Sequence, residues 1–167
     1  MEAFKKVLAT FPNSRLVIAG TGDLPEILQA AAPHWAHITL TGFINPDALK
    51  QLYAVADVGV MPSLMEQCSY TAIEMRFHKI PIIVSAVDGL DEMYEHEVDA
   101  LKVPVHYTSK GIRILQPEEI AKSIIRLLKD EALAKQLAEN SHEKGLQLFT
   151  AERMGEEYLK IIEEMAT

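Results

Sequence analysis

The chain has 167 residues, of which 49% are hydrophobic and 24% charged, a composition typical of a globular domain with a substantial core. Its 16 basic and 24 acidic residues give a formal net charge of −8, which argues against a nucleic-acid surface or an anionic-membrane anchor. A single cysteine, Cys68, excludes an intramolecular disulfide and fits a reducing compartment, and no apolar run approaches the ~20 residues of a membrane span.

The first half of the chain alternates between predicted helices and strands. Residues 2–11 show helical apolar spacing with no capping residue before them, so the chain looks cut from a longer protein. Helices are predicted at 2–11, 23–32, 45–56, 69–77 and 89–95, and strands at 15–20, 37–42, 57–62, 81–85 and 100–104. This order predicts an α/β fold with a Rossmann-like parallel sheet and helices on both faces.

Several local cues support these elements. The near-continuous apolar run at 15–20 predicts a strand buried on both faces. Asp23 and Asn45 are the expected N-caps of the helices that follow them, and Pro46 suits a first helical position. The second half is predicted to be a helical segment, with helices at 117–129, 131–148 and 150–165. Because no linker or repeat interrupts the chain, we expect one domain over 1–167.

Open parallel sheets bind ligands beyond the carboxyl ends of their strands, so the turns that follow strands are candidate sites. The turn "AGTGD" contains Gly20 and Gly22, two glycines of a dinucleotide fingerprint, but Pro25 stands where the third belongs. NAD binding is weakly supported, and the turn is either a tight bend or a close approach to a ligand. In "TGFI", Gly42 permits a sharp turn, and Phe43 is either a pocket wall or a core residue.

The segment "EQCSYTAIE" places Glu66 and Glu74 on either side of a thiol and three hydroxyls, directly after a hydrophobic strand. If the segment were all helix, the two carboxylates would lie about 12 Å apart along the axis, and a loop at Glu66 would shorten that distance. Carboxylates accept paired hydrogen bonds from vicinal diols such as those of a ribose or hexose. The alternative is that Glu66 caps the helix electrostatically and Glu74 is solvated.

The same segment contains a predicted helix start. The helix should begin at Ser69 or Tyr70, which leaves free backbone N–H groups near Tyr70, Thr71 and Ala72. Such an N-terminus is suited to binding phosphate. A diphosphate ligand with a hydroxyl-bearing group at each end would therefore match the segment.

Two further features have simpler explanations. The turn "SAVDGLDE" carries a glycine and acidic residues after the strand at 81–85, and it reads equally well as a solvated loop and helix cap. His34 and His37 have a spacing that suits a metal, but no third ligand is evident near them. We therefore predict no metal site.

Together these segments resemble the C-terminal, donor-binding domain of the GT-B retaining glycosyltransferases, the group 1 family that includes glycogen synthases. The resemblance covers nearly the whole chain. It lies, in order, in "RLVIAGTGDL", "ITLTGFINPDALKQLYAVADVGVMPSL", the Glu66-x7-Glu74 pair and "PIIVSAVDGLDE". Either glutamate alone would be a weak signal, but the pair in this setting is specific.

The resemblance implies a donor site for a nucleotide-diphosphate sugar, used without a cofactor to move a hexosyl group to a glycan or lipid acceptor, as in polysaccharide biosynthesis. Glu74 should bind the ribose hydroxyls, and Glu66, the implied catalytic residue, should lie near the donor sugar. The remaining implied donor-binding residues are Gln67, Cys68, Ser69, Tyr70, Thr71 and Ala72, with Gly20, Gly22, Gly42, Phe43 and Ile44 bordering the nucleoside.

The chain departs from the family pattern at two places. Gln67-Cys68-Ser69 replaces a Gly-Phe-Gly sequence, so the donor sugar cannot be inferred from the family. Lys79 replaces a glycine two residues before a proline. If Lys79 adopts a left-handed conformation, the cost is roughly 1–2 kcal/mol, and Lys79→Gly should raise the melting temperature.

The family domain also begins with a further strand and a turn whose Arg and Lys bind the donor phosphates. By resemblance, this strand and the N-terminal acceptor-binding domain of the same enzyme are absent here. The chain alone is therefore expected to fold but to be inactive, and its truncated face is expected to promote self-association. The parent enzyme should be cytoplasmic, or peripheral to the inner membrane face, with no direct membrane contact from this domain.

Three alternatives remain open from the sequence. A nucleotide-sugar 2-epimerase of GT-B architecture would share the ribose-binding carboxylate. A receiver-like or flavodoxin-like module fits less well, because Met61-Pro62-Ser63 stands where a receiver needs a phosphorylatable aspartate. A non-catalytic α/β scaffold would differ from a transferase in not depending on Glu74 for donor binding.

Overall fold

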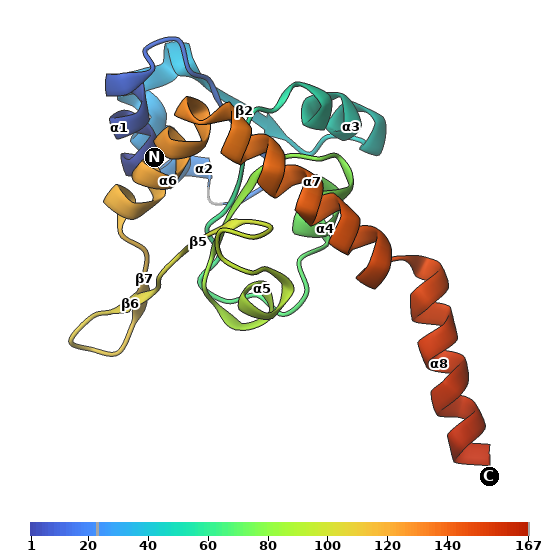
Figure 1. The fold of residues 1–167 in the computed structure, drawn as a ribbon. Coiled ribbons are helices and arrows are strands. Elements are labelled where there is room, and N and C mark those ends of the chain that lie inside the picture. The colour runs from blue at the N-terminus through green and yellow to red at the C-terminus, as the bar shows by residue number, and fades with distance from the viewer. Residues whose placement is uncertain (23, 167) are drawn as a thin grey trace.

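The chain folds into strands flanked by helices, and the computed structural model describes residues 1–22 and 24–166 (Figure 1). The strands are β1 (Leu16–Ala19), β2 (Ile38–Gly42), β3 (Gly59–Met61), β4 (Ile82–Ser85), β5 (Leu101–Val103), β6 (His106–Tyr107) and β7 (Arg113–Ile114). The helices are α1 (Glu2–Thr10), α2 (Leu24–Ala31), the 3-10 helix η1 (Ala32–His37), α3 (Pro46–Val55), α4 (Tyr70–Phe77), α5 (Asp88–Met93), α6 (Pro117–Lys129), α7 (Glu131–Leu148) and α8 (Ala151–Ala166).

The predicted α/β class and the predicted order of elements are confirmed. Asn45 is the N-cap of α3, since its side chain accepts a hydrogen bond from the Ala48 N–H at 2.8 Å. Asp23, the other predicted cap, lies outside the described residues. Three short elements were not predicted: the 3-10 helix η1 and the hairpin strands β6 and β7.

Among the described residues, the parallel strands form two separate ladders and not one continuous sheet. Strand β1 pairs with β2, while β3, β4 and β5 pair in that order, and β6 and β7 form an antiparallel hairpin. Strands β1 and β3 therefore each have one edge without a partner strand in the described part of the chain. The prediction that residues 15–20 are buried on both faces is wrong, because Val17 is 37% exposed and exposure alternates along β1.

The helix α6 connects the two ladders. Ala121 packs with Phe4 and Val7 of α1 in the core under β1 and β2, whereas Leu127 packs in the core under β3, β4 and β5. Ile124, between them, packs against both cores. The amphipathic face of α6 thus provides apolar packing that spans the two parts of the fold.

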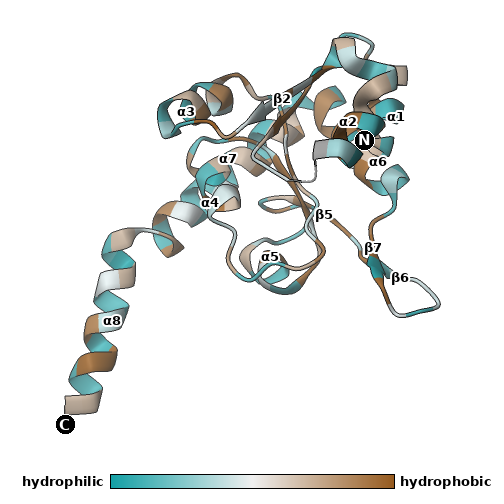
Figure 2. Cartoon of the chain, turned by 180° about the vertical axis from the view of Figure 1, so that it is seen from behind, coloured by the Kyte–Doolittle hydropathy of each residue, from teal (hydrophilic) through white to brown (hydrophobic). Residues whose placement is uncertain are grey.

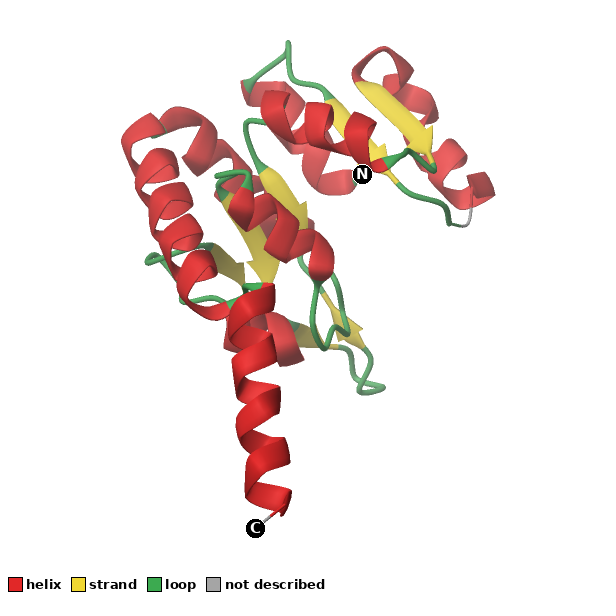
Figure 3. Cartoon of the chain, turned by 90° about the vertical axis from the view of Figure 1, so that its right-hand side faces the viewer, coloured by secondary structure: helices red, strands yellow, loops and turns green. Residues whose placement is uncertain are grey.

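The last helix, α8, extends away from the rest of the chain (Figures 1 and 3). Hydrophobic and hydrophilic residues mix along its length, as Figure 2 shows, and none of its residues is buried. Its large apolar side chains, all exposed, are Met154, Tyr158, Leu159, Ile161, Ile162 and Met165. In the described part of the chain, no helix combines the length and apolar character that crossing a membrane requires.

Candidate functional site

The predicted acidic pair lies on a loop and on the helix that follows it. Glu66 is in the loop after β3, and Glu74 is in the second turn of α4. Ser69 is the N-cap of α4, as its buried Oγ accepts the Ala72 N–H at 3.3 Å. The Ala72 amide is therefore not free, contrary to the prediction, whereas Tyr70 and Thr71 occupy the first turn, where N–H groups have no intrahelical partner.

The Glu74 carboxylate is held by a tyrosine from α3. The Tyr53 hydroxyl donates to Glu74 Oε2 at 2.9 Å, and Tyr53 is only 5% exposed. Burial and then the Glu74 carboxylate raise the pKa of the Tyr53 phenol, so it remains a donor at neutral pH. His78 completes the group: its ring lies 4.9 Å from that of Tyr53, and its Nδ1 is 2.8 Å from the Glu74 carbonyl oxygen. Glu74 itself stays exposed, with its second oxygen available to a ligand.

A buried arginine fixes the other face of α4. Arg76 is fully buried; its Nη2 donates to the Met93 carbonyl oxygen at 2.7 Å and lies 3.4 Å from Asp99 Oδ2. Its guanidinium stacks 4.2 Å above the ring of Tyr94, whose hydroxyl donates to the Ala72 carbonyl oxygen at 2.8 Å. These contacts anchor the helix that carries Glu74, so this carboxylate projects from a rigid element.

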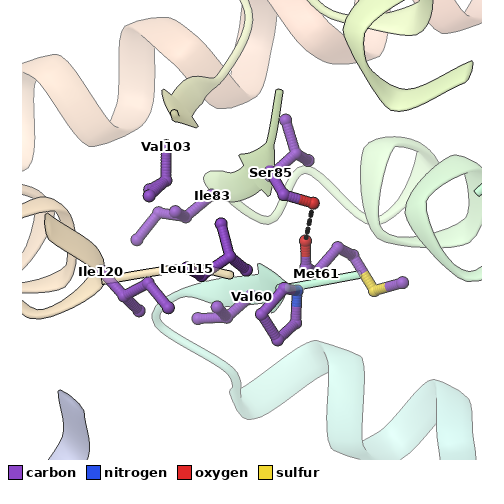
Figure 4. A pocket seen from close by; sticks show the side chains of 9 residues that line it. Val60, Met61, Ile83, Ser85, Val103, Leu115 and Ile120 are labelled. Carbon is purple, nitrogen blue, oxygen red and sulfur yellow. Dashed lines mark hydrogen bonds between the residues drawn. The ribbon is translucent and has the colours of Figure 1, made fainter. Parts of the chain in front are cut away.

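The loop that carries Glu66 is tied to the end of β4. The Ser85 hydroxyl donates to the Met61 carbonyl oxygen at 3.4 Å (Figure 4). It also donates to the carbonyl oxygen of Ser63, in the loop itself. Beside it lies an apolar space lined by Val60, Ile83, Val103 and other core side chains, which fill it and leave no room for a ligand. This apolar space is therefore part of the core and not a ligand site.

Gly89, on α5, contacts the same loop directly. Its N–H donates to the Glu66 carbonyl oxygen at 2.9 Å. A Cβ on Gly89 would lie 1.5 Å from the carbonyl oxygen of Gln67, so only glycine allows this approach. An open hollow of about 640 Å³ lies alongside; its lining is Leu64, Met65, Gln67, Asp88, Ile112 and Arg113.

The two glycine turns of the first ladder lie side by side. The Gly20 N–H donates to the Gly42 carbonyl oxygen at 3.0 Å, and the two residues have φ angles of +121° and +63°. Both turns therefore need glycine. Phe43 is 84% exposed, which excludes its interpretation as a core residue, and Ile44 beside it is half-buried. Gly22, on the adjoining turn, is exposed.

The remaining predicted residues are surface groups. Gln67 and Cys68 are exposed, and Tyr70 is 78% exposed, as expected of side chains that face a ligand or solvent.

Of the two histidines considered for a metal, His37 has its Nδ1 3.1 Å from the carbonyl oxygen of Ser14. Within residues 1–22 and 24–166, no group of three His, Cys, Asp or Glu side chains is arranged to hold a metal ion.

Sequence reasoning missed three residues that support the site: Tyr53, Gly89 and Arg113. Tyr53 gave no signal because an aromatic residue at helical spacing fits an ordinary core position. Gly89 lies four residues after the end of β4, within α5, and the glycine in the turn "SAVDGLDE" was the one cue for a close backbone approach. Arg113 belongs to the hairpin of β6 and β7, which was not predicted, so its contacts were out of reach.

Comparisons with known proteins identify the family and the fold. The profile of a family described as glycosyl transferases group 1 matches residues 1–130. An uncharacterized glycosyltransferase of Methanocaldococcus jannaschii is 39% identical over 108 residues, which cover 62% of this chain and 27% of that protein.

Two solved structures share the fold. Sucrose-phosphate synthase from Thermosynechococcus elongatus superposes with a TM-score of 0.76 at 26% identity, over 98% of this chain and 42% of that one. HepE of Anabaena, solved with UDP-glucose, superposes with a TM-score of 0.77 at 16% identity, over 96% of this chain and 44% of that one. The chain thus spans less than half the length of each of these three proteins.

Proposed function

Since the chain belongs to the glycosyl transferases group 1 family, we propose that it is the donor-binding half of an enzyme that transfers a hexosyl group from a nucleotide-diphosphate sugar to a glycan or lipid acceptor. Its α/β fold is that of the donor-binding domain in GT-B glycosyltransferases. The donor, the acceptor and the retaining stereochemistry are parts of this proposal.

One observation carries the proposal: the Glu74 carboxylate is exposed yet oriented. Tyr53 holds one carboxylate oxygen at 2.9 Å, and α4 is anchored beneath it. A surface glutamate with no role gains little from such support, whereas a diol-binding carboxylate needs a fixed direction to accept two hydrogen bonds. In the proposal Glu74 accepts the two ribose hydroxyls of the donor.

The other residues follow from this placement. Glu66 lies beside the donor sugar and is the proposed catalytic group, and the first-turn amides of Tyr70 and Thr71 face the diphosphate, where the helix N-terminus favours negative charge. The exposed Gln67 and Cys68 line the sugar end, whereas the buried Ser69 contributes as the N-cap that sets the start of α4. The paired glycine turns, with Phe43 and Ile44, border the nucleoside, because the absence of side chains at Gly20, Gly22 and Gly42 leaves the backbone open to close approach.

We propose that the parent enzyme adds a strand to the unpaired edges of β1 and β3 and supplies an acceptor-binding domain. Unpaired edges leave backbone donors and acceptors without partners, which favours strand addition. Without the second wall and the cations expected on the added turn, the diphosphate charge is only partly compensated. The chain alone should therefore bind the donor weakly and not transfer sugar, and the same edges should promote self-association.

The test is an NMR titration of the chain with UDP, GDP and ADP, and with their glucose conjugates. We expect one nucleotide to shift amides of residues 66–74 at millimolar concentration, and Glu74→Ala to abolish those shifts. Glu157→Ala, on the outlying helix α8, is the matched control and should leave the shifts intact. Binding that survives Glu74→Ala would contradict the proposed ribose contact.

If none of the nucleotides binds, the titration is repeated on a protein extended upstream and including the N-terminal domain. Binding restored by the extension supports a donor site completed by the added turn. Absence of binding there too would refute the transferase assignment and favour a scaffold. Donor binding with epimerisation at C2 of the sugar, and no transfer, would favour the epimerase alternative.

A further inference from the structure

Arg113, on the hairpin strand β7, makes three hydrogen bonds to the segments that surround Glu66. Its Nη1 donates to Asp88 Oδ2 at 2.7 Å and to the Leu64 carbonyl oxygen at 3.0 Å, and its Nη2 donates to Asp88 Oδ1 at 3.1 Å. One guanidinium therefore joins the hairpin, the start of α5 and the loop that carries Glu66. Paired contacts of this kind define direction as well as distance.

Asp88 adopts a backbone conformation that an aspartate rarely takes. Its φ angle is +39°, in the left-handed region that favours glycine. The Asp88 carboxylate pairs with Arg113, whose hydrogen bonds lower the pKa of Asp88, and the nearby Glu66 backbone makes a smaller contribution in the same direction. Strained residues persist where surrounding contacts fix them, which here are those of Arg113.

Gly89 adds a second connection to the same loop. Its N–H donates to the Glu66 carbonyl oxygen at 2.9 Å, and its α-carbon has no space for a side chain against Gln67. The Glu66 residue is thus held through its own backbone on one side and through Leu64 on the other. Arg113 and Gly89 both bind the loop in which this chain has Gln67 and Ser69 where the family usually has glycines.

We infer that Arg113 is a positioning residue for Glu66, acting through a bracket formed by Asp88, Gly89 and Arg113 that fixes the loop against α5. The inference rests on the proposed function. In that function Glu66 contacts the sugar of the donor, so fixing Glu66 should affect binding of the sugar and not of the nucleotide. It also assigns a role to the hairpin, which presents Arg113 and forms one wall of the hollow beside Gln67.

The first arm of the test measures the loop itself. Amide hydrogen exchange of Gly89, whose N–H is bonded to Glu66, is compared in the wild-type chain and in Arg113→Gln and Asp88→Asn. Asparagine tolerates the left-handed conformation, so the second variant removes charge while keeping the backbone. Exchange should be about threefold to tenfold faster in both variants. Arg126→Gln, which breaks the exposed pair of Arg126 with Glu97 and touches none of the three bracket residues, is the control and should leave Gly89 unchanged.

The second arm measures the part of donor affinity that comes from the sugar. The ratio of Kd for UDP to Kd for UDP-glucose, or for the GDP or ADP pair if that base binds, should fall toward one in Arg113→Gln and Asp88→Asn. The affinity for the nucleotide alone should not change, because Glu74 is held separately by Tyr53. A loss of folded protein would weaken both ligands equally and leave the ratio as it was.

The outcomes separate the two proposals. Faster Gly89 exchange together with a lower UDP to UDP-glucose Kd ratio supports the positioning role. Faster Gly89 exchange with an unchanged Kd ratio means that the bracket only stabilises the loop, which overturns the positioning role. Unchanged exchange overturns the bracket whatever the ligand does. If the chain binds no nucleotide, the same ratio is measured on the upstream-extended protein. If that protein also fails to bind, the proposed function falls, and the positioning role falls with it.

Discussion

Replacing Lys79 by glycine should stabilise the chain. Lys79 follows the last turn of α4 with a φ angle of +54°, and its N–H donates to the Arg76 carbonyl oxygen at 3.1 Å, while the Ile80 N–H donates to that of Met75 at 3.1 Å. This is a Schellman motif whose left-handed position carries a lysine where glycine is preferred. The condition set by the sequence, a left-handed Lys79, is therefore met, and the predicted gain from Lys79→Gly stays a prediction.

The magnitude follows from three contributions. Relief of the left-handed strain returns about 1–2 kcal/mol, and the greater freedom of glycine in the unfolded chain removes about 0.4–1 kcal/mol of that gain. Lys79 Nζ also lies 2.8 Å from Glu139 Oε2, but both side chains are well exposed, so this pair contributes little. The net gain of about 1 kcal/mol corresponds to a rise in Tm of roughly 2–4 °C for a domain of this size.

The assay is thermal and urea unfolding of Lys79→Gly beside Glu139→Gln, which removes the ion pair and leaves the backbone unchanged. Because the hydrogen bond from Lys79 lowers the pKa of Glu139 below its usual 4.5, the pair stabilises the wild-type chain above that pH and is lost as the pH falls through the lowered value. The advantage of Lys79→Gly should therefore grow at acid pH. A Tm for Lys79→Gly at or below that of Glu139→Gln would refute the strain argument.

Three other substitutions probe the site and its supports. Tyr53→Phe removes the hydrogen-bond donor to Glu74. It should weaken nucleotide binding about threefold to tenfold by titration and lower the free energy of unfolding by about 1 kcal/mol. An unchanged nucleotide affinity would show that Tyr53 does not orient Glu74 for binding. Gly89→Ala places a methyl group on the Gln67 carbonyl oxygen and should cost about 3 kcal/mol in urea unfolding, so a variant as stable as wild type would contradict the close approach. Asn45→Ala removes the cap of α3 and should cost about 1 kcal/mol, whereas Asn45→Ser should retain most of it.

Local features of the fold could be predicted from the sequence, and contacts between distant segments could not. The caps at Asn45 and Ser69 and the left-handed Lys79 depend on residues within one helical turn, so their signals are complete in the printed sequence. The separation of the strands into two ladders depends on which strands pair with each other. The hydrophobic pattern of a single strand does not determine its pairing partner. The pairing of Asp88 with Arg113, 25 residues later, depends on a hairpin with too few strand residues to detect.

The acidic pair lies between these cases. The sequence predicted a polar loop at Glu66 and a helix that begins at Ser69 or Tyr70 and carries Glu74, and the structure has that arrangement. What orients each glutamate came from elsewhere: Tyr53 lies 21 residues before Glu74. A residue of this kind shows no distinguishing pattern because its ring is buried like any core aromatic, and only its hydroxyl has a specific partner.

The bridging position of α6 has a consequence for the order of folding. The core of the β3, β4 and β5 ladder joins segments closer in sequence, such as Val103 and Leu127. The core of the first ladder joins Ala121 to Val7, more than a hundred residues earlier in the chain. Closing so long a loop is slower than local assembly. The packing of α1 against α6 is therefore expected to form after the ladder of β3, β4 and β5, although Ala31 and Ile38 of the same core lie closer to α1 in sequence. Pulse-labelled hydrogen exchange should protect amides of β4 before that of Val7.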